Sequence, residues 1–557
     1  MPRYYLENSD SFLKIVQDSY KSNPKYDEIR PGLPENYKDI RTIGDLLRNN
    51  YKSLSVQQQL RQNLILKLKN STFPYPGIIG YDDDIVPSLN RAILSGHDIL
   101  IIGQIGQAKT KIAETIAKNL LSPIPVVRGT ITHDIPTSIP ESELISLLRD
   151  EEVSRTLPEF SVSTECEDII RNYKLDTKIE WLDGNQRFKY ILATPDISVK
   201  DLVGQIDAIK VVKKGIEIYN IDSYSPGQLL QARHGILCID ELPVLDPRKQ
   251  VALLSVLQEG KFTTGSFPVI FRPNTLIVCT ANPIDYTHAG KIIEPLHDRL
   301  KSHVVTHYPK DILDEMTIMV QESNILDHNG IFIPVFILQS IAEISRIARE
   351  HQEINHDKGV SVRMSIHSTE VIVSESERTR SIRYKVSAIP RFSDIYSIHQ
   401  TAKFELSEID DIYENRTRVL DSMIAESLKK VSTSYLSDIP PEEIIQVRNN
   451  FTNKERFLVS QKFLWNAVDT NESYQTQIAE FPSLRRILDL VTTRVIREQE
   501  KFEKNVRKHG VESKCIALDK KLDPELYASI LELVLEGLRS MQSTFLERRD
   551  GFYAAIK

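Results

Sequence analysis

The stretch between residues 98 and 120 carries residue types that bind phosphate groups. Gly103 and Gly106 lie in a turn that runs into Ala108, Lys109 and Thr110. Backbone N–H groups of such a turn, and the N-terminus of a following helix, can face a triphosphate because both are partly positive. The lysine can reach the terminal phosphate oxygens, and the threonine hydroxyl can coordinate Mg²⁺. The predicted nucleotide-binding residues are Gly103, Gln104, Gly106, Gln107, Ala108, Lys109 and Thr110.

This turn departs from the usual phosphate-loop pattern, G-x-x-x-x-G-K-[ST], at one position. Ala108 stands where the last glycine belongs. Its methyl group takes space beside the phosphates but removes no N–H donor. Taken alone, the turn is also compatible with an ordinary strand–helix connection that exposes a lysine.

A second motif, Gly235–Glu241, is an apolar run that ends in two adjacent carboxylates. Asp240 is expected to hold the Mg²⁺ shell, and Glu241 to polarise the water that attacks the γ-phosphate. Many strands end in acidic residues, but the two motifs in this order are much harder to obtain by chance. Together they predict a nucleotide hydrolase.

Buried strands must hold both motifs in place. Ile99–Ile102 is apolar on both faces, which is typical of a central strand of a parallel sheet. An amphipathic helix with Ile112 and Leu120 on its apolar face follows the turn. Thr275–Thr280 and Val304–His307 are predicted to be further strands. The expected fold class is therefore α/β, a parallel sheet flanked by helices.

Weaker patterns predict the connecting elements. Pro125–Thr130 is expected to be a short strand, and Lys178–Tyr190 a β-hairpin turning at Asp183-Gly184. Pro247–Glu259 is predicted to be a helix with Val251, Leu254 and Leu257 on its apolar face, and Gly260–Pro273 a second hairpin.

A chain of 557 residues exceeds what one core usually holds, so several domains are expected. The predicted parts are a helical N-terminal preface (1–70), the nucleotide-binding core (71–310, with an insertion at 131–190), a helical lid (311–400) and a helical C-terminal region (401–557).

Composition narrows the class of protein. The formal net charge of −7 argues against a protein built mainly for contacts with nucleic-acid phosphates. The 4 cysteines are scattered without a C-x-x-C, so neither a zinc site nor a disulfide framework is indicated. The N-terminus lacks the apolar segment of a signal peptide, and no run of ~18 apolar residues occurs. A cytoplasmic protein without a membrane segment is expected.

The ordered set of motifs resembles the AAA+ layout. FPYPGIIG before the core, SPGQLLQARHGILCIDELPVLDP, and LQEGKFTTG followed by LIVCTANPIDY resemble the ATPase subunit of magnesium chelatase and its MoxR-like relatives. The phosphate loop with GQAKT is similar to that of a magnesium chelatase-like bacterial subfamily. The resemblance covers roughly residues 70 to 400 and implies ATP and Mg²⁺ as ligands.

The resemblance also implies roles for three later residues. Asn282 would be the first sensor and orient the attacking water, and Arg299 in the D-R-L element would be an arginine finger for a neighbouring subunit's γ-phosphate. Arg363 would be the second sensor. Positive charge around the equatorial phosphate oxygens is what phosphoryl transfer needs. Each of these three residues also has an ordinary structural interpretation. Asn282 could be a turn residue, and Arg299 a solvated charge at a helix end. Arg363 could form an ion pair with an acid such as Glu370.

Arg233 and His234, just ahead of the second motif, are candidates for additional contacts to a neighbouring subunit. Residues in this place more often cap a helix or line an interface, so they are not included among the site residues.

The leading functional hypothesis is a remodelling ATPase that forms a ring, expected to be a hexamer, and acts on a protein partner. In the resembled family that partner commonly carries a von Willebrand A domain with D-x-S-x-S. Here Asp196–Lys200 has lysine in place of the second serine, so the chain does not supply that domain itself. Insertion of magnesium into a porphyrin is not expected of this chain alone.

Two other function classes stay open. A nucleic-acid motor, helicase-like or transcription-activating, is disfavoured because the G-A-F-T-G-A loop of sigma-54 activators is absent and the 260–273 hairpin offers only Lys261 and Arg272. A non-enzymatic, nucleotide-gated scaffold is disfavoured by the intact pair Asp240-Glu241.

Overall fold

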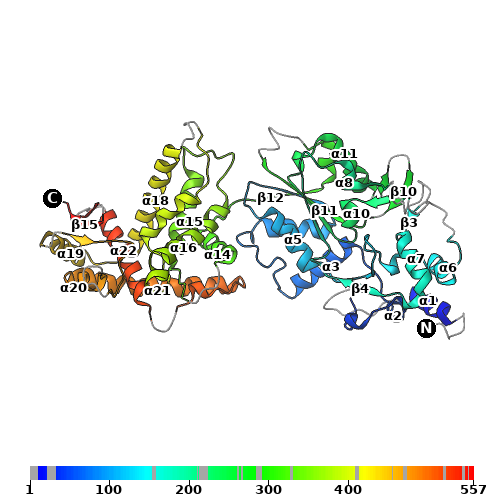
Figure 1. Cartoon of the computed structure of the whole chain (residues 1–557), viewed down its shortest axis with the longest axis horizontal. Helices are drawn as coiled ribbons and strands as arrows, with labels where there is room; N and C mark the ends of the chain where they lie inside the picture. The colour runs from blue at the N-terminus through cyan, green and yellow to red at the C-terminus, as the bar shows by residue number, and fades with distance from the viewer. Residues whose placement is uncertain are drawn as a thin grey trace. The chain divides into compact units, whose positions relative to one another are not determined.

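The computed structural model describes residues 11–21, 33–153, 159–207, 209, 211–212, 224–259, 262–264, 267–271, 273–283, 292–325, 330–407, 413–453, 456–467, 473–518, 522–541, 546–549 and 551–556. Its contacts divide the chain into two compact units (Figure 1). The first comprises residues 1–103 and 108–307, and the second comprises residues 104–107 and 308–557. The sequence predicted four parts.

A five-stranded sheet forms the centre of the first unit. Its order is β12 (Ser302–Val305), β1 (Ile99–Ile102), β11 (Leu276–Ala281), β8 (Ile236–Asp240) and β5 (Phe188–Leu192). All four neighbouring pairs are parallel. The predicted α/β fold class with a parallel sheet is confirmed. Strand β12, which was predicted at Val304–His307, begins and ends two residues earlier than predicted.

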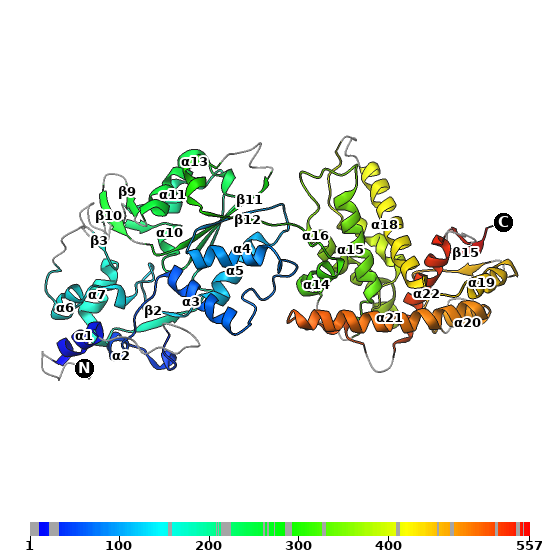
Figure 2. The same ribbon diagram turned by 180° about the vertical axis from the view of Figure 1, so that it is seen from behind.

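Helices cover both faces of this sheet, which explains why its strands are apolar on both sides (Figures 1 and 2). Ile99 and Ile101 pack in a core with helices on one face, and Leu100 packs in a second core on the other face. The first face carries α3 (Val56–Lys69), α4 (Ile85–Ser95) and α5 (Lys109–Leu120). The second carries α8 (Val199–Val203), α10 (Gln228–Gln231), α11 (Pro247–Glu259) and α13 (Glu294–Arg299).

Helix α11 confirms the predicted helix and, at Leu254, its predicted apolar face, whereas Val251 does not belong to that face and the side chain of Leu257 lies outside the description. Val251 is 54% exposed, whereas Leu253 is buried in the core and Gln250 is buried beside it. The side chain of Gln250 donates to Leu245 O at 2.7 Å and accepts from Ile293 N–H at 2.9 Å. Two hydrogen bonds thus satisfy the buried amide of Gln250. A pattern of apolar residues could not predict that this polar side chain points into the core.

A smaller cluster joins the N-terminus to the inserted residues. It combines α1 (Ser11–Lys21) and α2 (Ile43–Arg48) with α6 (Glu141–Arg149) and α7 (Thr164–Tyr173). The predicted N-terminal preface therefore divides: α2 packs on the insertion, and α3 packs on the sheet. Short 3₁₀ turns lie at Tyr37–Asp39, Pro136–Ser138, Lys174–Asp176 and Leu242–Val244.

The predicted hairpin at Lys178–Tyr190 is wrong. Its first strand, β4 (Ile179–Leu182), pairs antiparallel with β2 (Ile124–Val127), and its second strand is β5 of the main sheet. A Cβ on Gly184 would lie 2.2 Å from Ala117 O, so the turn is pressed against α5. The two strands on either side of this turn belong to different sheets.

Short antiparallel strands complete the first unit. β6 (Gly204–Ile206) pairs with β7 (Tyr224–Pro226). β9 (Phe262–Thr264) pairs antiparallel with β10 (Phe267–Phe271), which confirms the second predicted hairpin. β10 also pairs with β3 (Glu159–Phe160), and this pair is parallel. Lys261, Gly265 and Arg272 of that hairpin lie outside the described residues.

The second unit is mainly helical and has one core. A single cluster of buried apolar side chains runs from Met316 to Tyr553, so residues 311–400 and 401–557 share it. Its helices are α14 (Ile312–Glu322), α15 (Val335–Glu350), α16 (Val362–Ser376), α17 (Ile382–Tyr384), α18 (Tyr413–Leu436), α19 (Pro441–Asn453), α20 (Tyr474–Ala479), α21 (Pro482–Lys508) and α22 (Pro524–Ser540), with a π-helical turn at Glu377–Ser381 and 3₁₀ segments at Phe392–Gln400 and Lys514–Ile516.

Near the C-terminus the structure adds a small antiparallel sheet that the sequence did not predict. Its order is β13 (Phe457–Leu458), β15 (Phe552–Ala555) and β14 (Leu546–Arg549). None of the described helices combines the length and the apolar character that crossing a membrane requires.

Candidate nucleotide-binding site

The carboxyl ends of β1, β8 and β11 bring several predicted residues together in the first unit. Ile102 lies beside Ala281 in the parallel register, and Gly103 N–H donates to Ala281 O at 3.0 Å. Asp240 is the last residue of β8. Asn282 directly follows β11 and is half-buried. The turn after β1 therefore starts beside the strand that carries Asn282.

Lys109 is the first residue of α5, and its Nζ donates to Gly103 O at 2.6 Å. The preceding residue, Ala108, has φ 53° and ψ 20°, a left-handed conformation that suits glycine better. The four residues between Gly103 and Ala108 group with the second unit. There Gln104 donates its side-chain N–H to His356 O at 2.9 Å, and Gln107 Oε1 accepts from Gln104 N–H at 3.0 Å.

Three hydroxyl groups surround the Asp240 carboxylate. Thr110 Oγ1 and the Tyr190 hydroxyl both donate to Asp240 Oδ2, at 3.1 Å and 3.0 Å. Thr280 Oγ1 donates to the other oxygen, Oδ1, and accepts from Glu241 N–H at 3.0 Å. Glu241, in a left-handed conformation with φ 56°, is exposed beside this cluster. Thr110, which follows the loop, is thus joined to the carboxylate of Asp240 at the end of β8.

Sequence reasoning missed Tyr190 and Thr280. Thr280 carries a weak signal, because a polar residue interrupts the apolar run of β11 two positions before Asn282. Tyr190 carries none, since it was assigned to a hairpin and only the pairing of β5 with β8 brings it to Asp240. Partial burial and the neighbouring Asp240 carboxylate raise the pKa of the Tyr190 hydroxyl to about 12, so it is protonated and donates.

The donor set fits Mg²⁺. Thr110 Oγ1 and Asp240 Oδ2 are hard oxygen atoms 3.1 Å apart, close enough to share one ion. Mg²⁺ prefers such ligands and takes only one or two carboxylates, because it keeps several waters and binds phosphates as well. Among the described residues no group of three or more His, Cys, Asp or Glu side chains forms a metal site of another kind.

The two predicted arginines lie in different units. Arg299 ends α13, where its Nη1 donates to Pro295 O at 3.0 Å and lies 3.7 Å from Asp298 Oδ2. Arg363 lies in the first turn of α16, with an exposed side chain. The alternative of an ion pair with Glu370 is wrong, because Glu370 instead accepts from Asn324 N–H at 2.7 Å and no ion pair of Arg363 occurs among the described residues.

Arg233 and His234 are buried inside the first unit. Arg233 Nη1 lies 2.6 Å from Asp134 Oδ1, and the two side chains are 3% and 0% exposed. Burial and the nearby Arg233 charge hold the pKa of His234 well below its usual value, so its ring is neutral. These two residues, which were not included among the predicted site residues, connect the insertion to the start of β8.

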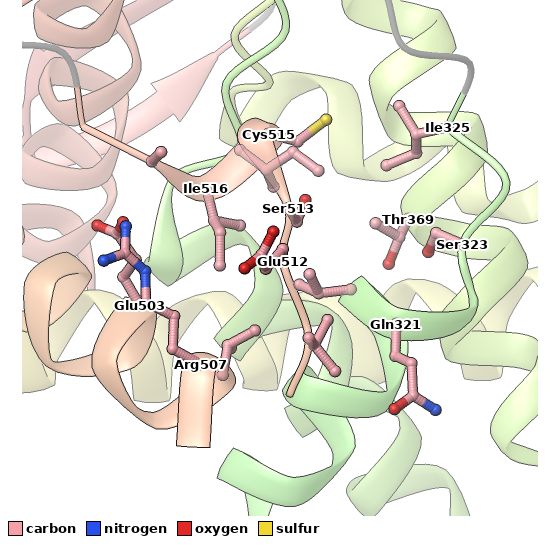
Figure 3. A pocket seen from close by; sticks show the side chains of 15 residues that line it. Gln321, Ser323, Ile325, Thr369, Glu503, Arg507, Glu512, Ser513, Cys515 and Ile516 are labelled. Atoms are coloured by element: carbon pink, nitrogen blue, oxygen red, sulfur yellow. The ribbon is translucent and has the colours of Figure 1, made fainter. Parts of the chain in front are cut away.

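A separate cavity of about 790 Å³ lies within the second unit, between the ends of α14 and α21 and the segment 511–517 (Figure 3). Glu503 and Arg507, which form an ion pair at 2.5 Å, lie in its wall together with Cys515. None of the residues predicted from the sequence lines it.

Comparison with known proteins shows which families the chain is similar to. A model described as the sigma-54 interaction domain matches residues 220–306. The magnesium-chelatase subunit ChlI of Cyanophora paradoxa is 24% identical over 288 residues, which is 51% of this chain and 73% of that protein. The chain is similar to AAA+ ATPases of the magnesium chelatase-like type. The resemblance predicted from the motifs is confirmed.

Other similarities are shorter or structural only. YeaC, an uncharacterized protein of Bacillus subtilis (strain 168), is 27% identical over 126 residues, 22% of this chain and 35% of YeaC, so the match spans about a third of that relative. BchI–BchD of magnesium chelatase gives a TM-score of 0.32 at 15% identity, covering 62% of this chain and 99% of that chain. NtrX from Brucella abortus with ATP gives 0.35 at 13%, covering 67% and 68%.

Proposed function

We propose that this AAA+ protein binds ATP with Mg²⁺ at the strand ends of the first unit and hydrolyses it. The observation that carries the proposal is the 3.1 Å hydrogen bond from Thr110 to Asp240, two residues 130 positions apart. It joins the phosphate loop to the strand-end carboxylates, which is the arrangement that P-loop hydrolases use.

Each residue then has a defined task. Lys109 Nζ, now on Gly103 O, lies at the loop and can turn to the terminal phosphate oxygens. Thr110 and Asp240 would hold Mg²⁺, which neutralises charge on the phosphates when bound. Glu241 would take the proton of the attacking water, and Asn282 would orient that water. Thr280 holds the Glu241 backbone by accepting its N–H.

Two substitutions test this assignment. Lys109→Ala is expected to lose nucleotide binding, whereas Glu241→Gln should keep binding and lose turnover by about 10²-fold or more, the scale of a missing general base. Lys118→Ala is the matched control, because Lys118 is exposed at the other end of α5. Binding is measured by equilibrium titration and turnover by phosphate release. Hydrolysis by Glu241→Gln at the parent rate would show that Glu241 does not activate water.

The active unit is proposed to be a closed ring, a hexamer, in which Arg299 completes the neighbour's site. One observation supports this: among the described residues, Arg299 bonds only within its own helix. Head-to-tail contacts between identical subunits can close into a ring. The second sensor role of Arg363 is part of the same proposal.

Mixing two inactive variants tests the shared site. Arg299→Ala should bind ATP and hydrolyse it about 10³-fold more slowly, the value of an arginine finger. Mixed with Lys109→Ala, it should regain activity where its intact phosphate loop meets the neighbour's intact Arg299. Full activity of a strictly monomeric protein, measured with light scattering in line, would exclude the shared site.

The client is proposed to be a protein with a von Willebrand A domain, by analogy with the magnesium chelatase-like family. A second candidate is action on a transcription complex, which the sigma-54 match at residues 220–306 favours. Capture from native cells with the ATP-bound Glu241→Gln protein separates them: the first predicts recovery of a von Willebrand A protein, and the second predicts recovery of sigma factor or promoter DNA.

A further inference from the structure

Tyr190 lies on β5, the edge strand of the main sheet, and is 45% exposed. Its hydroxyl donates to Asp240 Oδ2 at 3.0 Å, the same oxygen that accepts from Thr110 Oγ1 at 3.1 Å. A phenol that reaches the carboxylate of a metal site from an exposed edge strand is not needed to build the sheet. Its position therefore calls for a role at the site.

The hydrogen-bonding capacity of the carboxylate indicates that role. Each oxygen of an ionised aspartate offers two lone pairs. On Asp240, Oδ2 already accepts from two hydroxyls, whereas Oδ1 accepts from Thr280 on the side of β11. Oδ2 is also the oxygen that faces Thr110, the other expected ligand. When Thr110 Oγ1 becomes a ligand of the ion, it gives up its hydrogen bond to Oδ2, and the ion and the Tyr190 hydroxyl are left to compete for the electron density of that oxygen.

We propose that Tyr190 competes with Mg²⁺ for Asp240 Oδ2 and so sets the Mg²⁺ concentration at which the nucleotide site is filled; this rests on the proposed function. Because its side chain is half exposed, the phenol can turn into water, where its hydroxyl finds new partners. Tyr190 is thus a positioning residue that acts through Asp240.

Mg²⁺-dependent binding of a fluorescent ATP analogue tests the competition, with Glu241→Gln as the parent so that nothing is hydrolysed. Tyr190→Phe removes the hydroxyl and keeps the ring. The half-saturating Mg²⁺ concentration should fall about threefold to tenfold, the weight of one hydrogen bond. Binding of the analogue in excess EDTA should stay unchanged, because the proposal concerns the ion and not the nucleotide. Tyr173→Phe is the matched control, an exposed tyrosine on α7.

An unchanged or higher half-saturating Mg²⁺ concentration in Tyr190→Phe would overturn the proposal, since the hydroxyl would then be neutral or would help to hold the carboxylate. Equal melting temperatures of the parent and of Tyr190→Phe exclude a folding defect as the cause. If the parent binds no nucleotide at any Mg²⁺ concentration, the proposed function itself fails. The two failures are therefore distinguishable.

Discussion

At the scale of single residues, Ala108 adopts the left-handed backbone conformation that glycine usually adopts at this position of a phosphate loop. Ala108 adopts φ 53°, the left-handed region in which a Cβ is strained by roughly 1–2 kcal/mol. The sequence shows that alanine replaces the usual glycine, and the positive φ angle shows that this alanine is strained. The N–H groups of the loop are unaffected by the methyl group.

Ala108→Gly is therefore expected to raise the free energy of unfolding of the first unit by up to about 1 kcal/mol, because the relieved strain exceeds the added freedom of the unfolded chain. Nucleotide affinity should change by less than about tenfold, since no donor is added. Ala113→Gly, in the interior of α5, is the control and should destabilise by about 1 kcal/mol or more. Thermal unfolding and nucleotide titration measure both. A gain of several orders of magnitude in affinity would mean that the methyl group blocks the site.

At the scale of elements, buried charges hold the insertion against the main sheet. Arg233, just before β8, forms its ion pair with Asp134, which also accepts hydrogen bonds from Thr132 and from Ser163. Arg187, fully buried, donates to His234 O and to Gln59 Oε1. Because β8 carries Asp240, these contacts also help to position the carboxylates that are proposed to act in catalysis.

Arg233→Met should destabilise the first unit by about 3–5 kcal/mol, because Asp134 would remain buried without its cation. Arg171→Met is the control: Arg171 pairs with the exposed carboxylate of Asp150 at 3.4 Å and should contribute less than about 1 kcal/mol. Urea unfolding followed by circular dichroism measures both. Equal losses of unfolding free energy in the two variants would contradict the structural role of the buried pair of Arg233 and Asp134.

At the scale of the whole molecule, the second unit behaves as one body. Its apolar cluster reaches from Met316 to Tyr553, and the fully buried Arg391 lies 2.5 Å from Glu525 and 3.8 Å from Glu532, both on α22. The segment that the sequence predicted as a lid thus shares its core and a buried charge network with the C-terminal helices.

Removal of residues 401–557 should therefore unfold the remaining part of the second unit. The shortened chain exposes the apolar faces of α15 and α16 and leaves Arg391 without either glutamate. Calorimetry of the full chain and of residues 1–400 should show the loss of one transition, together with stronger binding of an apolar dye. A shortened chain that keeps every transition of the full chain would show that residues 311–400 fold by themselves.

The sequence by itself determined the local parts of this protein. The apolar run of β1, the glycine turn, Lys109-Thr110 and the amphipathic α5 are each specified within a few neighbouring residues, and so is the run that ends at Asp240. These signals depend on backbone freedom and on side-chain periodicity, which are properties of adjacent positions. For this reason the fold class and the main candidate residues could be predicted.

Only the tertiary structure decided which distant segments meet. Periodicity shows that β4 and β5 are strands, but it does not show that β4 pairs with β2 and β5 with β8. That pairing brings Tyr190 to Asp240. In the same way, no local pattern shows that Arg233 turns inward, because its partner Asp134 lies 99 positions earlier. A buried charge or an added hydroxyl is specified by contacts distant in sequence, and these exist only once the chain has folded.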